Sequence, residues 1–528
     1  MLRLVIFLSL INIAYSYKIL IYNPRLSHSH ITFVGKIADI LQEAGNDVTV
    51  LQQIQAKNVT TIGSKLAKVI ILNGADTEHE MLELKKSFDK NIWSLEDNNN
   101  IFDASAILNR VWKINEKQCK TLISNQTLIK ELKDQKFDIG FAETFSSCGF
   151  GILNKVNIKT IISGAATGFG EAFFSDYGLP FPTSYLPPIM GGGNIPKGFR
   201  ERLRNVITYH VSKYMYVDAS IQSSQRAYNE IYGNNAPNIA ELIKNVAFSV
   251  INTSPLLDFP HPTTSKIVEI AGIELAKPNK VDEQWDRILN LRPKNVLISF
   301  GSAVMSYEMP LEMKLSIVKS IKQFPETTFI WKYESNDTTF ADGCDNIIFK
   351  EWIPQIEILN DVRLNLFVTH GGLNSAIELA SRGTPAIFIP LFSDQKRNAF
   401  MLGRYGSSKV LNKINLMDDK IFSELIREML MNDIYKVNAK KLSSMVYNYP
   451  LDGKNKLIKS FAFACEFGHV KEMDLPSVEM NFVELYNLDI YTLAFFLIII
   501  LFLIIFKCLH YILIKLIRTS SRYKQKKE

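Results

Sequence analysis

Cysteine is scarce in this sequence, and the few cysteines show no pattern typical of a disulfide framework or a metal site. The 528 residues include five cysteines without paired spacing: Cys119, Cys148, Cys344, Cys465 and Cys508. An Asp-x-Asp motif and a His/Cys cluster are missing as well. The spacing therefore indicates no disulfide framework and no metal site, and the disulfide state of the four cysteines before residue 489 stays open.

Internal repeats and low-complexity tracts are also missing, and the body of the chain carries little excess charge. The formal net charge is +7, and residues 507–528 alone contain seven Lys or Arg and one Glu, a net of +6. Nearly all of the excess lies in this tail, so nucleic-acid binding is not indicated. A basic tail after an apolar run is instead typical of the cytosolic end of a membrane protein.

Two apolar segments predict membrane targeting. Residues 1–16 resemble a cleaved secretory signal, with Arg3, an apolar run over 4–13 and Ala14-Tyr15-Ser16 at the end; an uncleaved anchor is the alternative. Residues 490–506 contain no charge and would span roughly 25 Å as a helix. We predict a transmembrane helix over residues 489–514, rather than a buried core helix, and a cytosolic tail over 515–528.

Further short motifs agree with a body in the lumen of the secretory pathway. Asn58, Asn125 and Asn336 begin glycosylation sequons, although such triplets are common. Lys524 and Lys526 lie five and three positions from the end and resemble a dilysine retrieval signal of the endoplasmic reticulum. We predict a single-pass type I protein of that membrane.

The body itself reads as two α/β halves. Residues 18–22 form an apolar strand, followed by a loop to His30, a helix over 31–44 and a strand over 47–51. A second series begins with a strand at 295–300. The junction lies between residues 258 and 281, and 528 residues are enough for two cores. We predict domains over 17–276 and 277–450, joined to the membrane helix by residues 451–488.

Residues 367–395 are the most informative segment, because they read as strand, tight turn, helix and strand. His370, Gly371 and Gly372 fill the turn before a helix N-terminus, which attracts an anion such as a phosphate. Asp394 and Gln395 follow the next strand at the same edge and offer a carboxylate and an amide to hydroxyls. An anion site beside a polyol site indicates a sugar nucleotide.

This segment closely resembles the signature of the UDP-glycosyltransferase family in its membrane-bound animal branch, of nematode type, and the resemblance covers most of the chain. It implies a GT-B fold, in which two Rossmann-like domains face each other across a cleft. The first domain would bind the acceptor and the second the UDP-sugar.

The resemblance also implies how the nucleoside and sugar are held. Trp352 and Gln355 match a donor-binding tetrapeptide in which the Trp stacks on uracil and the Gln supports base or ribose. Taken alone, Trp352 also fits a core residue beside a turn. Glu378 resembles the carboxylate that binds the ribose, and Asp394 with Gln395 matches the pair that holds the transferred sugar.

The phosphate contacts are implied in the same way. His370 would bind the diphosphate, while Gly371 and Gly372 allow close approach of the backbone. Asn374, in the first turn of the helix, and Ser302, in a Gly-Ser turn, match two further contacts. No metal or cofactor is expected, since the helix N-terminus, His370 and Ser302 would stabilise the leaving diphosphate.

The assignment of a catalytic pair is implied by alignment with the family. His30 falls at the position of the base that takes a proton from the acceptor hydroxyl, and Glu143 at the position of the carboxylate that stabilises the imidazolium. Many vertebrate members have Asp there, so the geometry of the pair is open. His28 is the alternative base.

The expected reaction is an inverting transfer of glucuronate or glucose from a UDP-sugar to a hydroxyl of a small lipophilic acceptor, as in detoxification. Residues 165–174 and 185–189 would contribute to the acceptor pocket. A glycolipid-forming hexosyltransferase and an inactive UDP-sugar-binding relative are the alternatives. The sequence leaves the sugar, the acceptor and a homo- or hetero-oligomeric state open.

Overall fold

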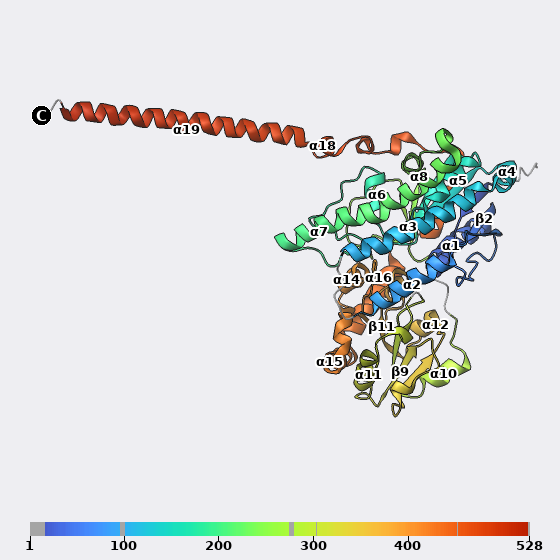
Figure 1. Cartoon of the computed structure of the whole chain (residues 1–528). Coiled ribbons are helices and arrows are strands. Elements are labelled where there is room, and N and C mark those ends of the chain that lie inside the picture. Colours follow the sequence, from blue (N-terminus) through green and yellow to red (C-terminus); the bar gives the residue numbers. More distant parts are fainter. Residues whose placement is uncertain (1–15, 95–100, 274–278, 303, 451, 526–528) are drawn as a thin grey trace, which may run out of the picture.

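The computed structural model describes residues 16–94, 101–273, 279–302, 304–450 and 452–525. The predicted signal segment lies outside these residues except for Ser16, and so do the last three residues of the predicted tail. The described chain forms two α/β domains and one long helix that leaves the first domain (Figure 1).

The first domain is built on a parallel sheet in which seven strands are described, in the order β3-β2-β1-β4-β5-β6-β7. The strands are β1 (Lys18–Tyr22), β2 (Asp47–Ile54), β3 (Lys68–Asn73), β4 (Ile139–Glu143), β5 (Thr160–Ala165), β6 (Ser249–Ile251) and β7 (Ile267–Glu269). The central strands are apolar on both faces because helices cover both sides. The carboxyl ends of β1 and β4 are neighbours, since Tyr22 pairs with Ala142.

The helices of the first domain form two layers. One face is covered by α1 (His28–Glu43) and α17 (Gly453–Phe467). The other face is covered by α3 (Ile101–Ser124), α4 (Gln126–Asp134), α5 (Cys148–Lys155), α8 (Ala219–Tyr232) and α9 (Ile239–Lys244). Additional helices are α2 (Glu78–Ile92), α6 (Glu171–Asp176), α7 (Phe199–Ser212) and the π-helical segment η2 (Lys213–Asp218).

The second domain contains a parallel sheet with the described order β10-β9-β8-β11-β12-β13. Its strands are β8 (Lys294–Ser299), β9 (Thr327–Lys332), β10 (Ile347–Lys350), β11 (Leu364–Thr369), β12 (Ala386–Phe388) and β13 (Ser408–Val410). The helices are α10 (Glu283–Leu289), α11 (Leu311–Ile321), α12 (Gln355–Asn360), α13 (Leu373–Arg382), α14 (Gln395–Gly403), α15 (Asp419–Met431) and α16 (Ile434–Asn448). Two parallel-sheet domains and one candidate membrane helix confirm the predicted fold class.

Helix α1 begins three residues earlier than predicted. Ser27 is extended, with φ −145° and ψ 151°, and the N–H of Ile31 donates to its carbonyl at 3.2 Å. The predicted loop up to His30 is therefore wrong, and His30 lies in the first helical turn. A helical turn is compatible with the polar run Ser27-His28-Ser29-His30, because the outer face of that turn is exposed to water.

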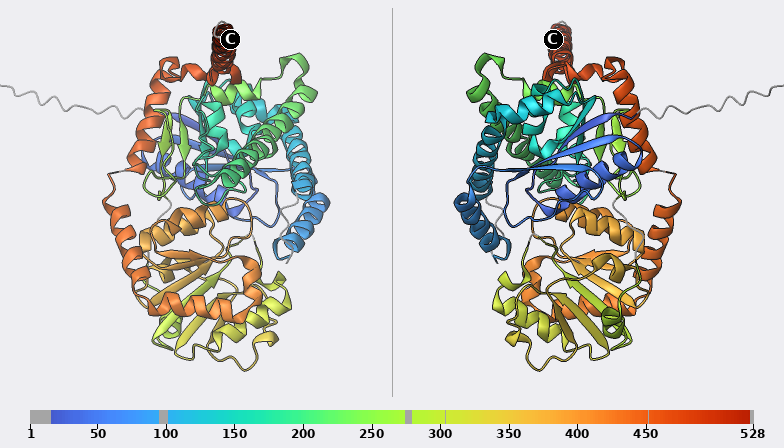
Figure 2. Two further views of the ribbon diagram at one scale, coloured as in Figure 1. Left: turned by 90° about the vertical axis from the view of Figure 1, so that its left-hand side faces the viewer. Right: turned by 90° about the vertical axis from the view of Figure 1, so that its right-hand side faces the viewer.

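Helix α17 returns the chain to the first domain, as Figure 2 shows from two sides. Its Leu457, Phe461 and Ala464 are buried against the first sheet. The segment predicted only as a connection to the membrane helix therefore adds a layer to the first domain. After α18 (Phe482–Leu485), α19 (Leu488–Gln525) extends away from the body, and its residues Leu488–Thr519 are long and apolar enough to cross a membrane.

The indication that the cysteines form no disulfide framework is wrong for two of them. Cys119 on α3 and Cys148 at the start of α5 form a disulfide, with their Cα atoms 5.8 Å apart. The sequence spacing of 29 residues gave no sign of this pair, because it forms only when both helices pack on the same face of the sheet. Cys344, Cys465 and Cys508 are free.

Candidate functional site

A cavity of about 860 Å³ lies between the two domains, where the carboxyl ends of both sheets meet. Residues of both domains line it, so the site exists only when the domains face each other. This is the position at which open α/β sheets bind ligands. The cavity contains every residue that the sequence predicted for catalysis and donor binding except Gly371, which lies in the wall between two lining residues.

His30 and Glu143 form a close pair at the floor of this cavity. Nδ1 of His30 lies 2.7 and 2.8 Å from the two carboxylate oxygens of Glu143. The backbone N–H of Ala166 donates to Oε1 of Glu143 at 2.8 Å and fixes the buried carboxylate. With a carboxylate at Nδ1, that nitrogen carries the proton and the acceptor lone pair lies on Nε2. The glutamate side chain is therefore long enough to form the pair.

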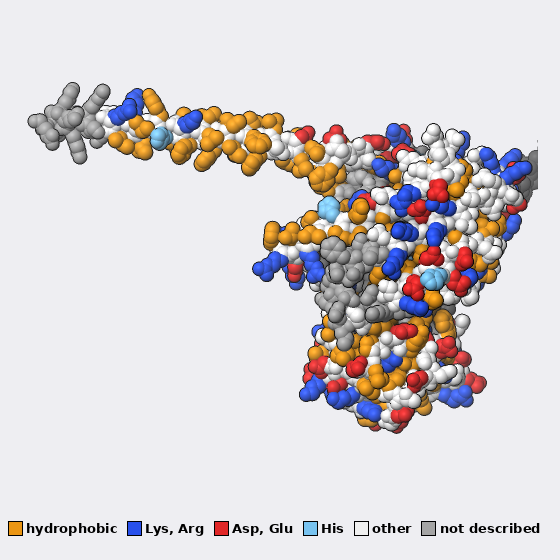
Figure 3. All heavy atoms as spheres, viewed as in Figure 1, with side chains coloured by type: hydrophobic (Ala, Val, Ile, Leu, Met, Phe, Trp, Pro, Cys, Tyr) orange, Lys and Arg blue, Asp and Glu red, His pale blue; other side chains and the backbone are white. Residues whose placement is uncertain are grey.

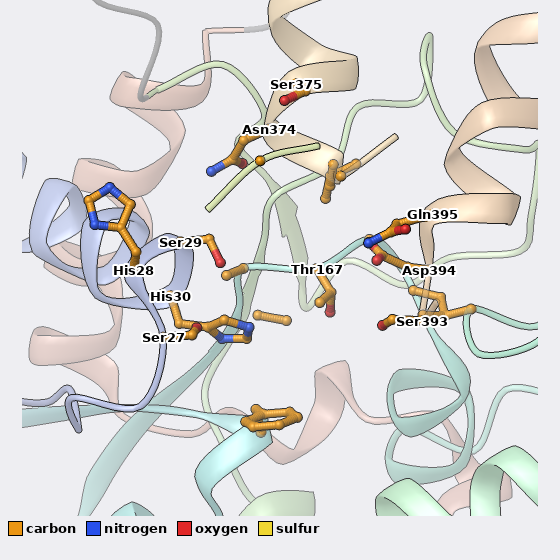
Figure 4. Close-up of a pocket in the computed structure, with 18 of the residues that line it drawn as sticks. Ser27, His28, Ser29, His30, Thr167, Asn374, Ser375, Ser393, Asp394 and Gln395 are labelled. Atoms are coloured by element: carbon orange, nitrogen blue, oxygen red, sulfur yellow. The ribbon is translucent and has the colours of Figure 1, made fainter. Parts of the chain in front are cut away.

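His28 has a different environment from His30. Its Nδ1 lies 2.8 Å from the hydroxyl of Thr61 at the exposed edge of α1. In Figure 4 the ring of His30 extends towards Thr167 and the middle of the pocket, whereas His28 points away from it. The structure thus pairs only His30 of these two histidines with a carboxylate.

His370 is enclosed by glycines at the end of β11. Gly301 has a φ of +84°, and a Cβ there would lie 2.6 Å from Cε1 of His370. A Cβ on Gly372 would lie 2.8 Å from Nε2 of the same ring. Burial, with a smaller contribution from Lys332, lowers the pKa of His370 to about 4 despite an opposing hydrogen bond to the backbone of Ser299, so the imidazole is neutral at pH 7.

The N-terminus of α13 opens beside His370. Gly371 has a φ of +91°, and Gly372 is the N-cap residue, so the first N–H groups of the helix face the cavity without a side-chain cap. Asn374 lies in the first turn and accepts a hydrogen bond at 3.0 Å from Asn252 of the first domain. Ser302 is exposed on the cavity wall.

Trp352 lies at the mouth of the cavity with 69% of its surface exposed. This excludes the alternative of a core tryptophan, and leaves an open indole face beside Gln355. The amide of Gln355 donates to Glu378 at 2.6 Å and to Ser375 at 3.2 Å, which joins α12 to α13. Burial raises the pKa of Glu378 to about 7.

Asp394 and Gln395 lie across the cavity from His30 (Figure 4). The N–H groups of Leu391 and Phe392 donate to Oε1 of Gln395 at 2.8 and 3.1 Å, which orients its amide. The amide of Asn398 donates to Asp394 at 2.8 Å, and burial raises the pKa of that carboxyl. Together they form a rigid polar corner opposite the histidine.

The first-domain side of the cavity is largely apolar, and the sequence identified only part of it. From the predicted segments, Phe173 and Ile189 line the cavity, but Tyr185 does not. Phe145, Tyr216, Val217, Ile221 and Ile243 line it as well and were missed. No local motif marks these residues, since they come from separate elements.

The remaining predicted positions lie outside the cavity. The three sequon asparagines, Asn58, Asn125 and Asn336, are exposed. Within the described ranges, no group of three or more His, Cys, Asp or Glu side chains is placed to hold a metal ion.

Solved structures with a similar fold include named glycosyltransferases. The kitacinnamycin glycosyltransferase aligns with a TM-score of 0.57 and 14% identity, over 85% of this chain and 98% of that one. UGT2 of Phytolacca americana, solved with UDP-2-fluoro-glucose and pterostilbene, aligns with a TM-score of 0.55 and 17% identity, over 85% of this chain and all of that one. These likenesses confirm the GT-B fold.

Sequence relatives extend over nearly the whole chain. The Caenorhabditis elegans proteins ugt-48 and ugt-55 both carry the provisional name UDP-glucuronosyltransferase. The first is 26% identical over 93% of this chain and 94% of its own length, and the second 28% identical over 83% and 85%. The family model described as UDP-glucoronosyl and UDP-glucosyl transferase matches residues 18–523, so the chain belongs to this family and is a UDP-glycosyltransferase.

Proposed function

We propose that the enzyme transfers glucose or glucuronate from a UDP-sugar to a hydroxyl of a small lipophilic acceptor, with inversion at the anomeric carbon. The observation that carries this proposal is the His30–Glu143 pair, which faces Asp394 and Gln395 across the cavity. A base and a sugar-binding corner then lie on opposite sides of the space where a reacting sugar would sit. The product is a conjugate of the kind made in detoxification.

The base acts on the acceptor hydroxyl. Nε2 of His30 takes the proton as the acceptor oxygen forms its bond to the anomeric carbon, and the bond from that carbon to the UDP oxygen breaks. Glu143 stabilises the imidazolium that results, since its carboxylate contacts Nδ1 at 2.7 Å. One displacement turns an α-linked donor into a β-glycoside.

The leaving diphosphate is stabilised by dipoles and by neutral donors. The N–H groups at the start of α13 provide a partial positive charge, and Ser302 and the neutral ring of His370 add hydrogen bonds. We propose that Asn374 contributes its amide N–H. We also propose that these groups suffice, so that transfer proceeds without a metal or a cofactor.

The acceptor lies against the apolar part of the cavity. Phe145, Phe173, Ile189, Tyr216 and Val217 line that part. Such a surface binds a lipophilic molecule and directs its hydroxyl to the polar floor around His30.

The body of the enzyme lies in the lumen of the endoplasmic reticulum, anchored by α19 with the basic tail in the cytosol. This orientation is supported by the net charge of +6 in residues 507–528 and by the exposed sequons. Glycans would be carried by Asn58, Asn125 and Asn336.

The function is tested by incubating the purified full-length enzyme with UDP-glucose, UDP-glucuronate and UDP-galactose and with panels of phenolic and lipid acceptors. We expect release of UDP together with a glycoside of a phenolic acceptor. UDP-sugar binding without transfer to any acceptor and without donor hydrolysis would overturn the proposal. Transfer to lipid acceptors alone would establish the glycolipid-forming alternative instead.

Trp352→Ala is expected to raise the KM for the UDP-sugar by about 5- to 150-fold, because stacking of a base on an aromatic ring contributes roughly 1–3 kcal/mol. Trp352→Phe keeps a ring and should retain most of the affinity. The measurement is steady-state kinetics with the donor varied at saturating acceptor. An unchanged donor KM in Trp352→Ala would remove this residue from the donor site.

Donor affinity is expected to depend on pH through Glu378. Its carboxyl group accepts hydrogen bonds from ribose hydroxyls more strongly, and through both oxygens, when it is ionised, and its pKa is raised to about 7. Between pH 6 and pH 8 the ionised fraction, and with it UDP affinity, should rise up to about tenfold. Calorimetric titration with UDP measures the affinity at each pH. Dividing the affinity of the unchanged enzyme by that of Glu378→Gln cancels the effect of the protonation of UDP itself. A pH-independent ratio would contradict the role.

A further inference from the structure

The cavity contains a carboxyl group that the proposed reaction does not use. Among the residues that the structure describes, the first domain lines the cavity with three carboxyl groups, of Glu143, Glu171 and Asp176, and with no Lys or Arg. Glu143 belongs to the proposed catalytic pair. Glu171 accepts hydrogen bonds from the N–H of Ile189 at 3.0 Å and from the hydroxyl of Ser212 at 3.1 Å. Asp176 is the one whose role is still open.

The described neighbours of Asp176 compensate its charge only in part. Its carboxyl group accepts a hydrogen bond from the hydroxyl of Ser175 at 3.4 Å, which is long for such a bond. Lys213 attracts it, but the ammonium group of Lys213 binds the carboxylate of Asp218 at 2.8 and 3.0 Å. Burial raises the pKa of Asp176 to about 7 despite Lys213 and the weaker attraction of Lys244. A further cation beside Asp176 would therefore stabilise its ionised form.

Aromatic side chains share the cavity wall with Asp176. Phe173 lies three positions earlier on α6, so both side chains lie on the same face of that helix, and both line the cavity. Helix α6 packs against the π-helical segment η2, which adds Tyr216 and Val217 to the wall. Aromatic faces attract cations. A carboxylate next to aromatic rings is therefore suited to bind an alkylammonium group.

The charge on the cavity wall differs from that on the outside of the body. Asp and Glu side chains are interspersed with Lys and Arg on the face of the body that Figure 3 shows. The described lining of the cavity contains six Asp or Glu residues and a single Lys, Lys332 of the second domain. A positively charged molecule would thus be attracted into the cavity, where the low-dielectric wall strengthens the attraction.

Asp176 and His30 have different surroundings within the same cavity. His30 contacts Glu143 and acts electrostatically on Asp394 of the second domain. Asp176 is the last residue of α6 and interacts with Lys213 of η2 instead. One elongated molecule in the cavity could therefore present one group to His30 and another to Asp176.

We propose that Asp176 determines acceptor specificity, because its carboxylate binds a protonated amine of the acceptor while His30 activates a hydroxyl of the same molecule. This inference rests on the proposed function, since the amine and the reacting hydroxyl belong to one acceptor. It narrows the acceptor class to lipophilic phenols or alcohols that carry a basic nitrogen away from the reacting hydroxyl. The rings of Phe173 and Tyr216 contact the carbon atoms next to that nitrogen.

The test compares two phenols of the same shape. One carries a dimethylaminoalkyl chain, which is protonated at neutral pH, and the other carries the uncharged isoalkyl chain of equal length. Pairs of several chain lengths are used, because the span from nitrogen to hydroxyl must match the cavity. The readout is kcat/KM for the amine divided by kcat/KM for its neutral counterpart, measured with the purified full-length enzyme. We expect this ratio to reach about tenfold or more for the best chain length, the usual strength of a hydrogen bond between charged groups.

Asp176→Asn keeps the shape of the side chain and removes its charge. It should lower the ratio to about one and leave kcat/KM for the neutral phenol within about twofold. Asp218→Asn leaves Asp176 intact but frees Lys213 to pair with it, so it should lower the ratio as well. The matched control is Asp134→Asn, which removes an exposed carboxylate at the end of α4 and should leave the ratio unchanged.

A ratio near one at every chain length in the unchanged enzyme would overturn the proposal, and so would a high ratio that persists in Asp176→Asn or Asp218→Asn. Calorimetric binding of the same phenols in the presence of UDP distinguishes this inference from the proposed function. Preferential binding of the amine that depends on Asp176, without any transfer, would support the amine site and overturn the reaction. Transfer to neutral phenols without preference for amines would support the reaction and overturn the amine site.

Discussion

Replacing His30 by alanine is expected to lower kcat by about 10²- to 10⁴-fold, the range for loss of a general base. The affinity for UDP should stay within about twofold, because His30 belongs to the first domain and the proposed donor contacts belong to the second. The measurements are initial rates of glycoside formation and calorimetric binding of UDP. Loss of UDP binding together with activity would indicate misfolding instead.

His28→Ala is the matched control, since it removes a histidine of the same helical turn that contacts Thr61 instead of Glu143. It should retain nearly full activity. Glu143→Gln should reduce kcat as well, because it keeps a hydrogen-bonding group but removes the charge that stabilises the imidazolium. If transfer survives in His30→Ala and vanishes in His28→Ala, the base is His28 and our assignment is wrong.

Arg397→Met is expected to lower the free energy of unfolding by about 3–5 kcal/mol, because it leaves a buried carboxylate without its partner. Arg397 on α14 and Asp258, in the loop between β6 and β7 of the first domain, are 2.7 Å apart, with both side chains 1% exposed. Nε of Arg397 also donates to the carbonyl of Pro187 at 3.1 Å. This pair therefore joins the two domains behind the cavity.

The midpoint of thermal unfolding measures this loss, and Lys319→Met is the control. Lys319 forms an ion pair with Asp419 at 2.8 Å, but its side chain is 71% exposed, so its loss should cost less than about 1 kcal/mol. The double variant Arg397→Met/Asp258→Leu should recover part of the stability, since no charge then remains buried. A decrease no larger than that of Lys319→Met would contradict the role of the pair.

Residues 367–395 were the part of the molecule best predicted from the sequence. They form a strand, a turn, a helix and a second strand, and each element has a local cause. Gly383 ends α13 in a left-handed conformation, with φ 70° and ψ 38°, as its position after the helical pattern predicted. Local signals of this kind are complete within residues 367–395, so they need no knowledge of the fold.

Features made by distant segments were not predictable in this way. The Cys119–Cys148 disulfide depends on two helices that meet only on the folded sheet. Helix α17 packs on the first domain because Leu457 and Phe461 are buried there. In the sequence these residues indicate only an amphipathic helix and not the domain on which it packs. The apolar wall around Tyr216 combines residues of several elements for the same reason.

The anomeric configuration of the product tests the central claim most directly. That claim is a single displacement, in which His30 activates the acceptor hydroxyl against a sugar held by Asp394 and Gln395. With an α-linked UDP-sugar and a phenolic acceptor, proton NMR of the fresh product should show a β-glycoside. An α-glycoside would require two displacements or a different attack geometry, and would contradict the account.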